Sequence, residues 1–246
     1  MIPTRDAVRA ALHRLFVCAE GTALRREDEK KSAEVVALLG ELHRAWPSRR
    51  GVMVDAAAGR GSVGLLAAEL LGAKELVVIE RAPDRVRACA EAATRLSSPA
   101  KVTVREADVG DLSAWPEAPA LVVALHACGG ASDAVLDAAV ARGAKRLLLV
   151  PCCYADAVAF SATARARAES LGLPRAAAVR RAFVTSLIDA ERTLRLEAAG
   201  YATEVVAFVP PTVTPHNLLW RARRVGEPVA MADAQARLDR LRAAGP

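Results

Sequence analysis

Apolar positions recur with helical spacing in the first fifty residues of the chain. Apolar residues three and four positions apart predict helices over residues 6–19 and 31–45. Pro47 and Gly51 then end the helical pattern. We therefore expect residues 1–50 to form an N-terminal helical extension.

From residue 51 onward, short apolar runs alternate with amphipathic segments. The runs predict strands over residues 51–56, 74–80, 101–107, 119–125 and 145–151, with helices over residues 62–71, 83–96 and 131–142 between them. Strands that alternate with helices form right-handed crossovers and a parallel sheet. Because most of the runs are apolar throughout, we expect helices on both faces of this sheet.

The pattern changes again after residue 151. It predicts two Ala- and Arg-rich helices over residues 155–171 and 176–199, strands over residues 201–209 and 218–224, and a last helix over residues 231–243. The short connection between the two late strands indicates an antiparallel hairpin. The predicted fold is α/β: a Rossmann-like, seven-stranded, doubly wound sheet with an antiparallel edge hairpin. This domain would span residues 51–246, with a helical insertion at about 155–199.

Composition and charge indicate where the protein is expected in the cell and what kind of partner it suits. Hydrophobic residues make up 53% of the 246 residues, which is enough for a sizeable core. The net charge of +6 suits an anionic partner such as nucleic acid, although the arginines are spread along the whole chain. No apolar run approaches the roughly 20 residues that span a bilayer. Five cysteines, an odd number, argue against a secreted disulfide scaffold. We expect a cytoplasmic protein without membrane contact.

Acidic and small residues gather where the first three predicted strands end. Asp55 closes the first strand, and Gly59 and Gly61 form the turn into the next helix. Glu80 closes the second strand, and Asp108 follows the third. Ligands of doubly wound sheets bind at the carboxyl ends of strands, and glycine lets the backbone approach them. A carboxylate at Glu80 suits the two hydroxyls of a ribose, and one at Asp108 suits an adenine amino group.

The turn after the first strand favours S-adenosylmethionine (SAM) over a dinucleotide. Its residues 57–61 read AAGRG, so the first glycine of the dinucleotide pattern G-x-G-x-x-G is missing. SAM carries no phosphate and needs only a close backbone approach and polar anchors. An α/β domain without a cofactor is the alternative, and the three aligned strand-end signals count against it.

The VDxxxGxG turn and the predicted sheet order resemble the class I SAM-dependent methyltransferases. KKSAEV at residues 30–35, ALHACGGASD at 124–133 and VPCCY at 150–154 resemble, more narrowly, a methyltransferase-domain family. That family has L-H-x-C-G after the fourth strand and a double cysteine after the fifth, and it includes a tRNA ribose methyltransferase. The resemblance implies SAM as the cofactor, with Ala57 and Leu125 beside it. Ala57 stands where most class I enzymes have glycine, which narrows the pocket slightly.

His126, Tyr154 and His216 are the candidates for the acceptor side of the site. The fourth and fifth strands should be neighbours, so His126 and Tyr154 are expected beside the sulfonium. His126 is suited to be a general base, because its ordinary pKa lies near neutrality, or to shape the pocket. His216 lies in a polar turn between the last two strands, and turn formation alone would explain that segment.

A metal site is a further interpretation of the cysteines. His126, Cys128, Cys152 and Cys153 together have the composition of a zinc ligand set. Adjacent residues of an extended chain point to opposite faces, so we expect Cys152 and Cys153 not to share an ion. The sequence therefore predicts a site without metal, in which at least one cysteine lines the cleft as a small hydrophobe.

The expected reaction is methyl transfer from SAM to an acceptor that the sequence does not identify. RNA is favoured narrowly by the basic charge and by the family resemblance. A small molecule or a peptide is the second reading, because aromatic residues make up only 4% of the chain and no stacking platform is visible. A non-catalytic SAM-binding module is the third. The arginines of residues 165–195 suit either an acceptor pocket or a solvated helix face.

Overall fold

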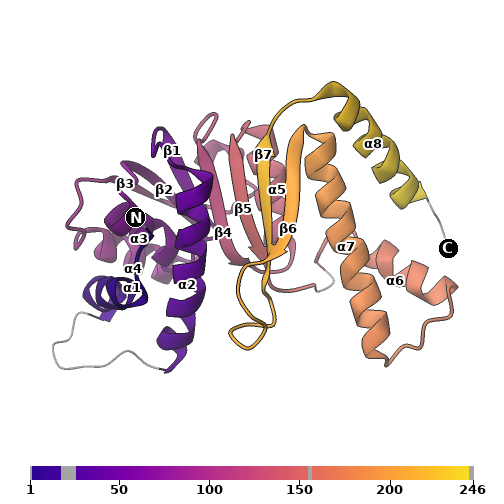
Figure 1. The fold of residues 1–246 in the computed structure, drawn as a ribbon, viewed down its shortest axis with the longest axis horizontal. Helices are drawn as coiled ribbons and strands as arrows, with labels where there is room; N and C mark the ends of the chain where they lie inside the picture. The colour runs from indigo at the N-terminus through magenta and orange to yellow at the C-terminus, as the bar shows by residue number, and fades with distance from the viewer. Residues whose placement is uncertain (1, 18–25, 155–156, 244–246) are drawn as a thin grey trace.

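A single seven-stranded sheet runs through the protein, in the order β3-β2-β1-β4-β5-β7-β6 (Figure 1). The computed structural model describes residues 2–17, 26–154 and 157–243. The strands are β1 (Val52–Ala56), β2 (Glu75–Glu80), β3 (Lys101–Glu106), β4 (Leu121–Ala127), β5 (Arg146–Pro151), β6 (Tyr201–Ala207) and β7 (Leu218–Arg224). The first five strands are parallel, and β7 runs antiparallel to both β5 and β6. The predicted doubly wound sheet and its antiparallel edge hairpin are therefore confirmed.

Helices cover both faces of the sheet. One face packs against α1 (Arg5–Leu12), α2 (Arg26–Ala45), α3 (Ser62–Leu71) and α4 (Pro83–Ala93), and the other against α5 (Gly130–Ala141) and α7 (Ala178–Ala198). The remaining helices, α6 (Ser161–Ser170) and α8 (Pro228–Ala243), pack against α7. No helix in the described part of the chain is long and apolar enough to cross a bilayer.

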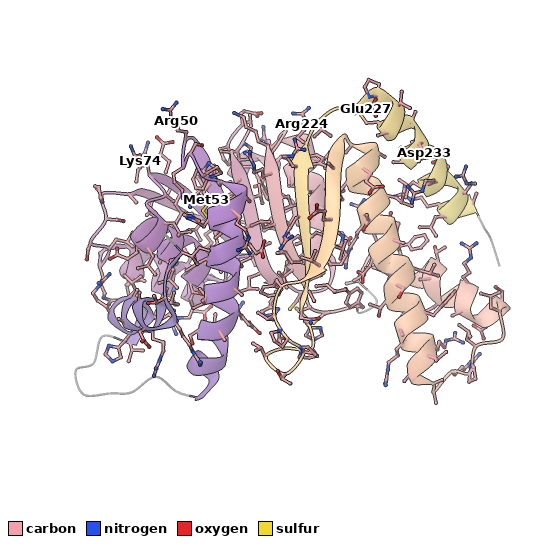
Figure 2. The ribbon with its side chains drawn as sticks, in the orientation of Figure 1. Arg50, Met53, Lys74, Arg224, Glu227 and Asp233 are labelled. Atoms are coloured by element: carbon pink, nitrogen blue, oxygen red, sulfur yellow. The ribbon has the colours of Figure 1, made fainter. Side chains whose placement is uncertain are left out.

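Alternation along the central strands explains why both layers of helices are needed. Met53 belongs to the apolar layer under α2 and α3, whereas its neighbour Val54 belongs to the layer under α5 (Figure 2). Leu148 and Leu149 divide between the two layers in the same way. Because successive side chains point to opposite faces, strands that are apolar throughout require cover on both sides.

The parallel strands all end at one edge of the sheet. Figure 2 shows Arg50 and Lys74, which precede β1 and β2, at the opposite edge, together with Arg224 at the end of the antiparallel β7. The carboxyl ends of β1 to β5 thus meet away from this row of cations. This is the edge where doubly wound sheets bind their ligands.

The structure differs from the sequence prediction at several element ends. The first predicted helix is α1 followed by a π-helical turn, His13–Val17, and its last two residues, including Cys18, lie outside the described residues. The helix predicted from residue 155 begins only at Ser161. The fourth strand runs on to Ala127, because a bulge at residues 125–127 shifts its register with β5. Residues 155–156 lie outside the described residues.

Asp55 ties the end of β1 to the start of α3. Its side chain is buried, and one carboxylate oxygen, Oδ2, accepts the N–H of Gly64 at 2.7 Å. The other oxygen, Oδ1, is buried and has no hydrogen-bond partner among the described residues. Burial raises the pKa of Asp55 from its ordinary value of 3.8 to about 7, and the Gly64 hydrogen bond offsets only part of that effect.

The raised pKa predicts that Asp55 makes folding pH-dependent. The contribution of Asp55 to the stability of the folded state is fully present below about pH 4, where the carboxyl is protonated in both states. It is lost as the pH rises through about 7. Asp55→Asn is neutral at every pH, so its stability relative to wild type should rise between these two values. Thermal unfolding of both proteins across this range measures the difference.

Asp84→Asn, at the exposed start of α4, is the matched control for the loss of one carboxylate. Its difference from wild type should not follow the same curve. A stability of Asp55→Asn that falls relative to wild type with rising pH would show that the buried carboxylate is stabilised in its charged form.

Candidate functional site

A cleft of about 590 Å³ lies at the carboxyl ends of β1 to β4. It is lined by Ala57, Glu80, Arg81, Arg85, Ala107, Asp108, Val109, His126, Cys128, Gly129, Gly130, Ala131, Ala134, Cys153 and Ala157. Its volume falls within the range of about 300–1,000 Å³ that small-molecule and cofactor sites occupy. Of the predicted cofactor residues, it brings together Ala57, Glu80 and Asp108.

The glycines of the turn after β1 have different roles. Gly61 has a φ of 75°, and a Cβ there would overlap the buried Sγ of Cys89, so this position requires glycine for packing. Gly59 also has a positive φ, of 59°, but a Cβ at Gly59 would meet no atom within 4 Å. Because this space is open, another molecule can come close to the backbone at Gly59. Neither glycine lines the cleft.

Glu80 holds this turn through its carboxylate. Its side chain is buried, Oε2 accepts the N–H of Gly59 at 2.7 Å, and Oε1 accepts the N–H of Ala82 at 2.9 Å. A carboxylate oxygen has two acceptor positions, so each oxygen keeps one for a ligand. Glu80 therefore both shapes the cleft and presents acceptors to it.

The rim of the cleft carries charges of both signs. Asp108 accepts the N–H of Gly110 at 2.9 Å, and its other oxygen lies 3.6 Å from the guanidinium of Arg81. The side chains of Arg81 and Asp108 are 79% and 58% exposed, so this ion pair is weak and easily exchanged for contacts to a ligand. Arg85, in the first turn of α4, lines the cleft as well.

Two residues of the cleft have a backbone conformation that side chains other than glycine rarely adopt. Ala57 has a φ of 51° and His126 a φ of 59°, and both line the cleft. Only Arg49 and Ala118 share this property among the other non-glycine residues that the structure describes. Such strain gathers at functional sites, where the surrounding structure enforces it.

His126 is held by a residue that the sequence analysis did not single out. Its Nε2 lies 2.9 Å from Oε2 of Glu34, a buried residue near the middle of α2. The other ring nitrogen, Nδ1, is buried and has no partner among the described residues. The available signal was that Glu34 belongs to the KKSAEV segment, but nothing in that segment indicated a contact with a residue 92 positions later.

The other predicted site residues lie outside the lining of the cleft. Tyr154 faces α7, where its hydroxyl donates to Oδ2 of Asp189 at 3.1 Å, and burial beside that carboxylate raises the pKa of Tyr154. His216 is exposed and donates its backbone N–H to Oγ1 of Thr214. Asp55 is buried beneath the turn, and Leu125 packs against the core between the sheet and α1 to α4.

The expectation that Cys152 and Cys153 diverge is wrong. Their Sγ atoms lie 3.5 Å apart, and these two atoms and Sγ of Cys128 all lie within 4.8 Å of one another. Strand β5 ends at Pro151, so the alternation of an extended chain does not apply to the two cysteines. Burial raises the pKa of Cys128 and of Cys152. No nitrogen of His126 belongs to this group of metal-ligating atoms.

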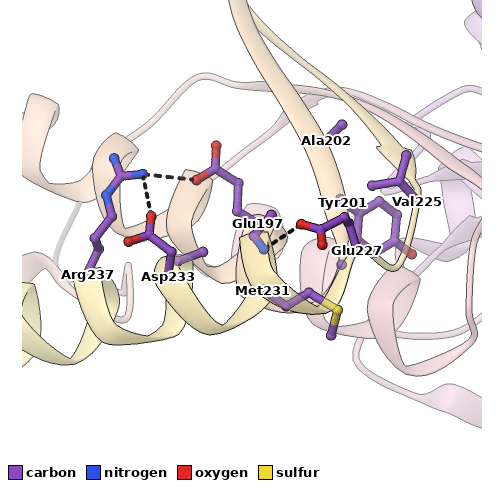
Figure 3. A pocket seen from close by; sticks show the side chains of 11 residues that line it. Glu197, Tyr201, Ala202, Val225, Glu227, Met231, Asp233 and Arg237 are labelled. Carbon is purple, nitrogen blue, oxygen red and sulfur yellow. Dashed lines mark hydrogen bonds and ion pairs between the residues drawn. The ribbon is translucent and has the colours of Figure 1, made fainter.

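Two further pockets lie elsewhere. One, of about 280 Å³, is formed by α8 against β6 and the end of α7, where Arg237 pairs with Glu197 and Asp233 (Figure 3). Another, of about 650 Å³, contains Arg146 and Arg221 and lies over the antiparallel strands toward the amino ends of the parallel ones. Neither contains a residue from the carboxyl ends of β1 to β4, so the first cleft is the candidate site.

Comparisons with known proteins identify the family of the chain. A family model described as a methyltransferase domain matches residues 30–159, which is more than half of the chain. The span runs from the start of the segment that contains Glu34 to the region after β5, and it includes every residue that lines the cleft. No curated protein matches the chain.

Solved structures share the fold at low sequence identity. A chain of the fibrillarin/Nop5p complex matches with a TM-score of 0.52 and 12% identity, over 78% of this chain and 81% of that one. Thermoplasma acidophilum 1320 matches with a TM-score of 0.50 and 13% identity, over 92% and 100% of the two chains. With the family match and the sheet order, these likenesses give the conclusion that the chain belongs to this methyltransferase-domain family and is a class I SAM-dependent methyltransferase.

Proposed function

We propose that the cleft at the carboxyl ends of β1 to β4 binds SAM and that the methyl acceptor is RNA. Glu80 would accept the ribose hydroxyls, and Asp108 the adenine amino group. The side chain of Ala57 would form the wall along the cofactor, and Gly59, just outside the lining, would leave the space beside it open. The observation that carries the cofactor site is the buried carboxylate of Glu80 at the edge of the cleft, with acceptor capacity left on both oxygens.

The residues present fit SAM on three counts. The cleft has a suitable volume and contains acceptors at the ends of two adjacent strands, β2 and β3. The open space at Gly59 leaves room for a ligand against the backbone. No phosphate has to be bound, which agrees with the missing first glycine of the dinucleotide pattern.

Bound SAM supplies an electrophilic methyl group on a sulfonium. The contribution of the protein would be to hold the acceptor in line with that group, because positioning alone lowers such barriers substantially. Gly129 and Gly130 line the cleft just after β4, and a Cβ at Gly130 would come within 2.9 Å of the carbonyl oxygen of Ala157, so the chain packs closely there.

His126 would act as a positioning residue for this site. A general base must reach the proton that it removes. One nitrogen of His126 is engaged by Glu34 and the other is buried, so neither is presented to the cleft. The pair fixes the imidazole and joins α2 to the bulge of β4. Its effect on methyl transfer would come through the shape of the pocket.

RNA as the acceptor is supported by the charge at the mouth of the cleft. Arg81 and Arg85 are exposed and line the same cleft as Glu80. Arginines in this position suit the phosphates beside a target nucleotide. The overall charge of +6 favours the approach of a polyanion. A small molecule or a peptide is the alternative acceptor, and a non-catalytic SAM-binding module is the alternative activity.

Replacing Glu80 should weaken SAM binding. Glu80→Gln removes the charge from the hydrogen bonds to the ribose, so affinity should fall by about 1–3 kcal/mol. Titration calorimetry measures the affinity, and thermal unfolding measures how far the turn itself is destabilised. Glu106→Gln is the control, because Glu106 pairs with Glu80 in the sheet register but is exposed and outside the cleft lining. Equal affinities for wild type and Glu80→Gln would remove the cofactor assignment.

The variant His126→Asn separates the two roles of His126. Asparagine is chosen because it tolerates the positive φ of this position. For a positioning residue, SAM affinity and turnover should fall together, and Glu34→Gln should produce a smaller fall in both. For a general base, turnover should fall by roughly 10²–10⁴-fold while SAM affinity is unchanged. Calorimetry and the pH profile of turnover, measured on both variants, separate the two. An unchanged SAM affinity with a lost limb of the pH profile would contradict the positioning role.

The acceptor is tested with labelled SAM and fractionated cell extract. Label should enter the RNA fraction and be released by ribonuclease but not by protease. Replacing Arg81 and Arg85 by Gln should weaken RNA binding and reduce the slope of log affinity against log salt by about 2. Arg87→Gln is the control, because Arg87 is an exposed arginine of α4, the helix that contains Arg85, and lies outside the cleft lining.

Other outcomes of the labelling experiment identify the alternatives. Label in a metabolite or peptide fraction would replace RNA by that acceptor. Tight SAM binding without transfer to any fraction would indicate the non-catalytic module.

A further inference from the structure

Three thiols from two neighbouring strand ends meet beside the cleft. Cys128 follows β4, and Cys152 and Cys153 follow β5. Their three Sγ atoms lie within 4.8 Å of one another, and those of the adjacent pair are 3.5 Å apart. Cys128 and Cys153 line the cleft, whereas Cys152 is buried behind it.

The backbone of β4 places these thiols. The bulge at residues 125–127 and the left-handed conformation of His126 turn the carbonyl of His126 toward the cysteines. That oxygen accepts hydrogen bonds from Sγ of Cys128, at 3.3 Å, and from Sγ of Cys152, at 3.6 Å. The cluster is therefore built on two paired strands and one strained residue of the sheet.

We propose that Cys128, Cys152 and Cys153 bind one thiophilic divalent cation, Zn²⁺, as three thiolates whose fourth coordination position faces the cleft. With Zn–S bonds of about 2.3 Å, tetrahedral coordination requires sulfur atoms about 3.8 Å apart. The adjacent pair has to open by about 0.3 Å from its 3.5 Å, and the other separations have to close by about 1 Å at most. Binding releases the three thiol protons to solvent and forms three Zn–S bonds, without an oxidant or a reductant.

The set of ligands determines the kind of site. No fourth His, Cys, Asp or Glu among the described residues joins the three sulfur atoms. Three protein ligands with an open position are typical of zinc sites that take up water or a substrate, whereas structural sites are closed by four. Since two of the three cysteines line the cleft, a molecule in the cleft would reach the open position.

The charge of the surroundings agrees with this assignment. Three thiolates around a divalent cation leave one net negative charge. Arg85 lines the same cleft and carries a charge of the opposite sign. A disulfide between two of the cysteines would leave the third unused, whereas a metal ion employs all three.

Cobalt substitution tests the site directly. The full chain, without a metal-binding tag and kept reduced, is titrated with Co²⁺ alone. We expect one equivalent of Co²⁺ per chain, a thiolate-to-cobalt charge-transfer absorption and the visible bands of tetrahedral cobalt. Added Zn²⁺ should displace the cobalt and remove these absorptions. Each of Cys128→Ser, Cys152→Ser and Cys153→Ser should weaken binding by at least ~10-fold, because a ligand contributes no less than a second-shell partner.

Cys89→Ala is the matched control, because Cys89 is buried on α4 against the Gly61 turn and away from the three thiols. It should bind cobalt as wild type does. Wild-type protein with all its thiols free that gives no charge-transfer band would overturn the proposal, as would an equal loss of metal in Cys89→Ala. The wild-type titration is decisive by itself, so the test does not depend on whether every variant folds. SAM affinity is measured separately, so a failed cofactor site and a failed metal site are distinguishable.

Discussion

The buried carboxylate of Glu80 holds together the two turns on which the cleft depends. It accepts the N–H of Gly59 in the turn after β1 and that of Ala82 in the turn after β2. Buried without these donors, the carboxylate would be costly, and without the carboxylate two N–H groups would lose their partners. The reach is possible because β1 and β2 are parallel and in register, with Ala56 beside Ile79. The sheet and this one side chain therefore fix the two turns beside the cleft.

Strain at Ala57 and His126 is the second condition for this geometry. A left-handed conformation costs a residue with a Cβ about 1–2 kcal/mol, so neither position is explained by local preference. Ala57 follows a strand whose core residues are fully buried. His126 lies between two residues that pair with β5, and Glu34 of α2 holds its imidazole. The helix before the first strand thus contributes to the site itself as well as to the packing of the sheet.

The sequence predicts the elements well wherever local signals mark their ends. The helix over residues 62–71 and the strand over residues 218–224 coincide with α3 and β7, and the glycines at 61 and 72 bound that helix. The sequence does not predict the features that depend on a contact between distant segments. Glu34 meets His126 across 92 positions, and Tyr154 turns toward Asp189 of α7. Neither pair has a period or a spacing that a single sequence displays, so such contacts require the fold.

The two adjacent cysteines lie beyond the part of the chain in which side chains alternate. Side chains alternate only while the chain is extended and paired, and the pairing of β5 with β4 stops at Pro151, opposite Ala127. Beyond that proline the chain turns, and the two sulfur atoms converge. The bulge in β4 brings the third. His126 therefore serves two neighbouring groups at once: its imidazole is bound by Glu34, and its carbonyl accepts the thiols of Cys128 and Cys152. One strained residue therefore joins the wall of the cleft to the thiol cluster.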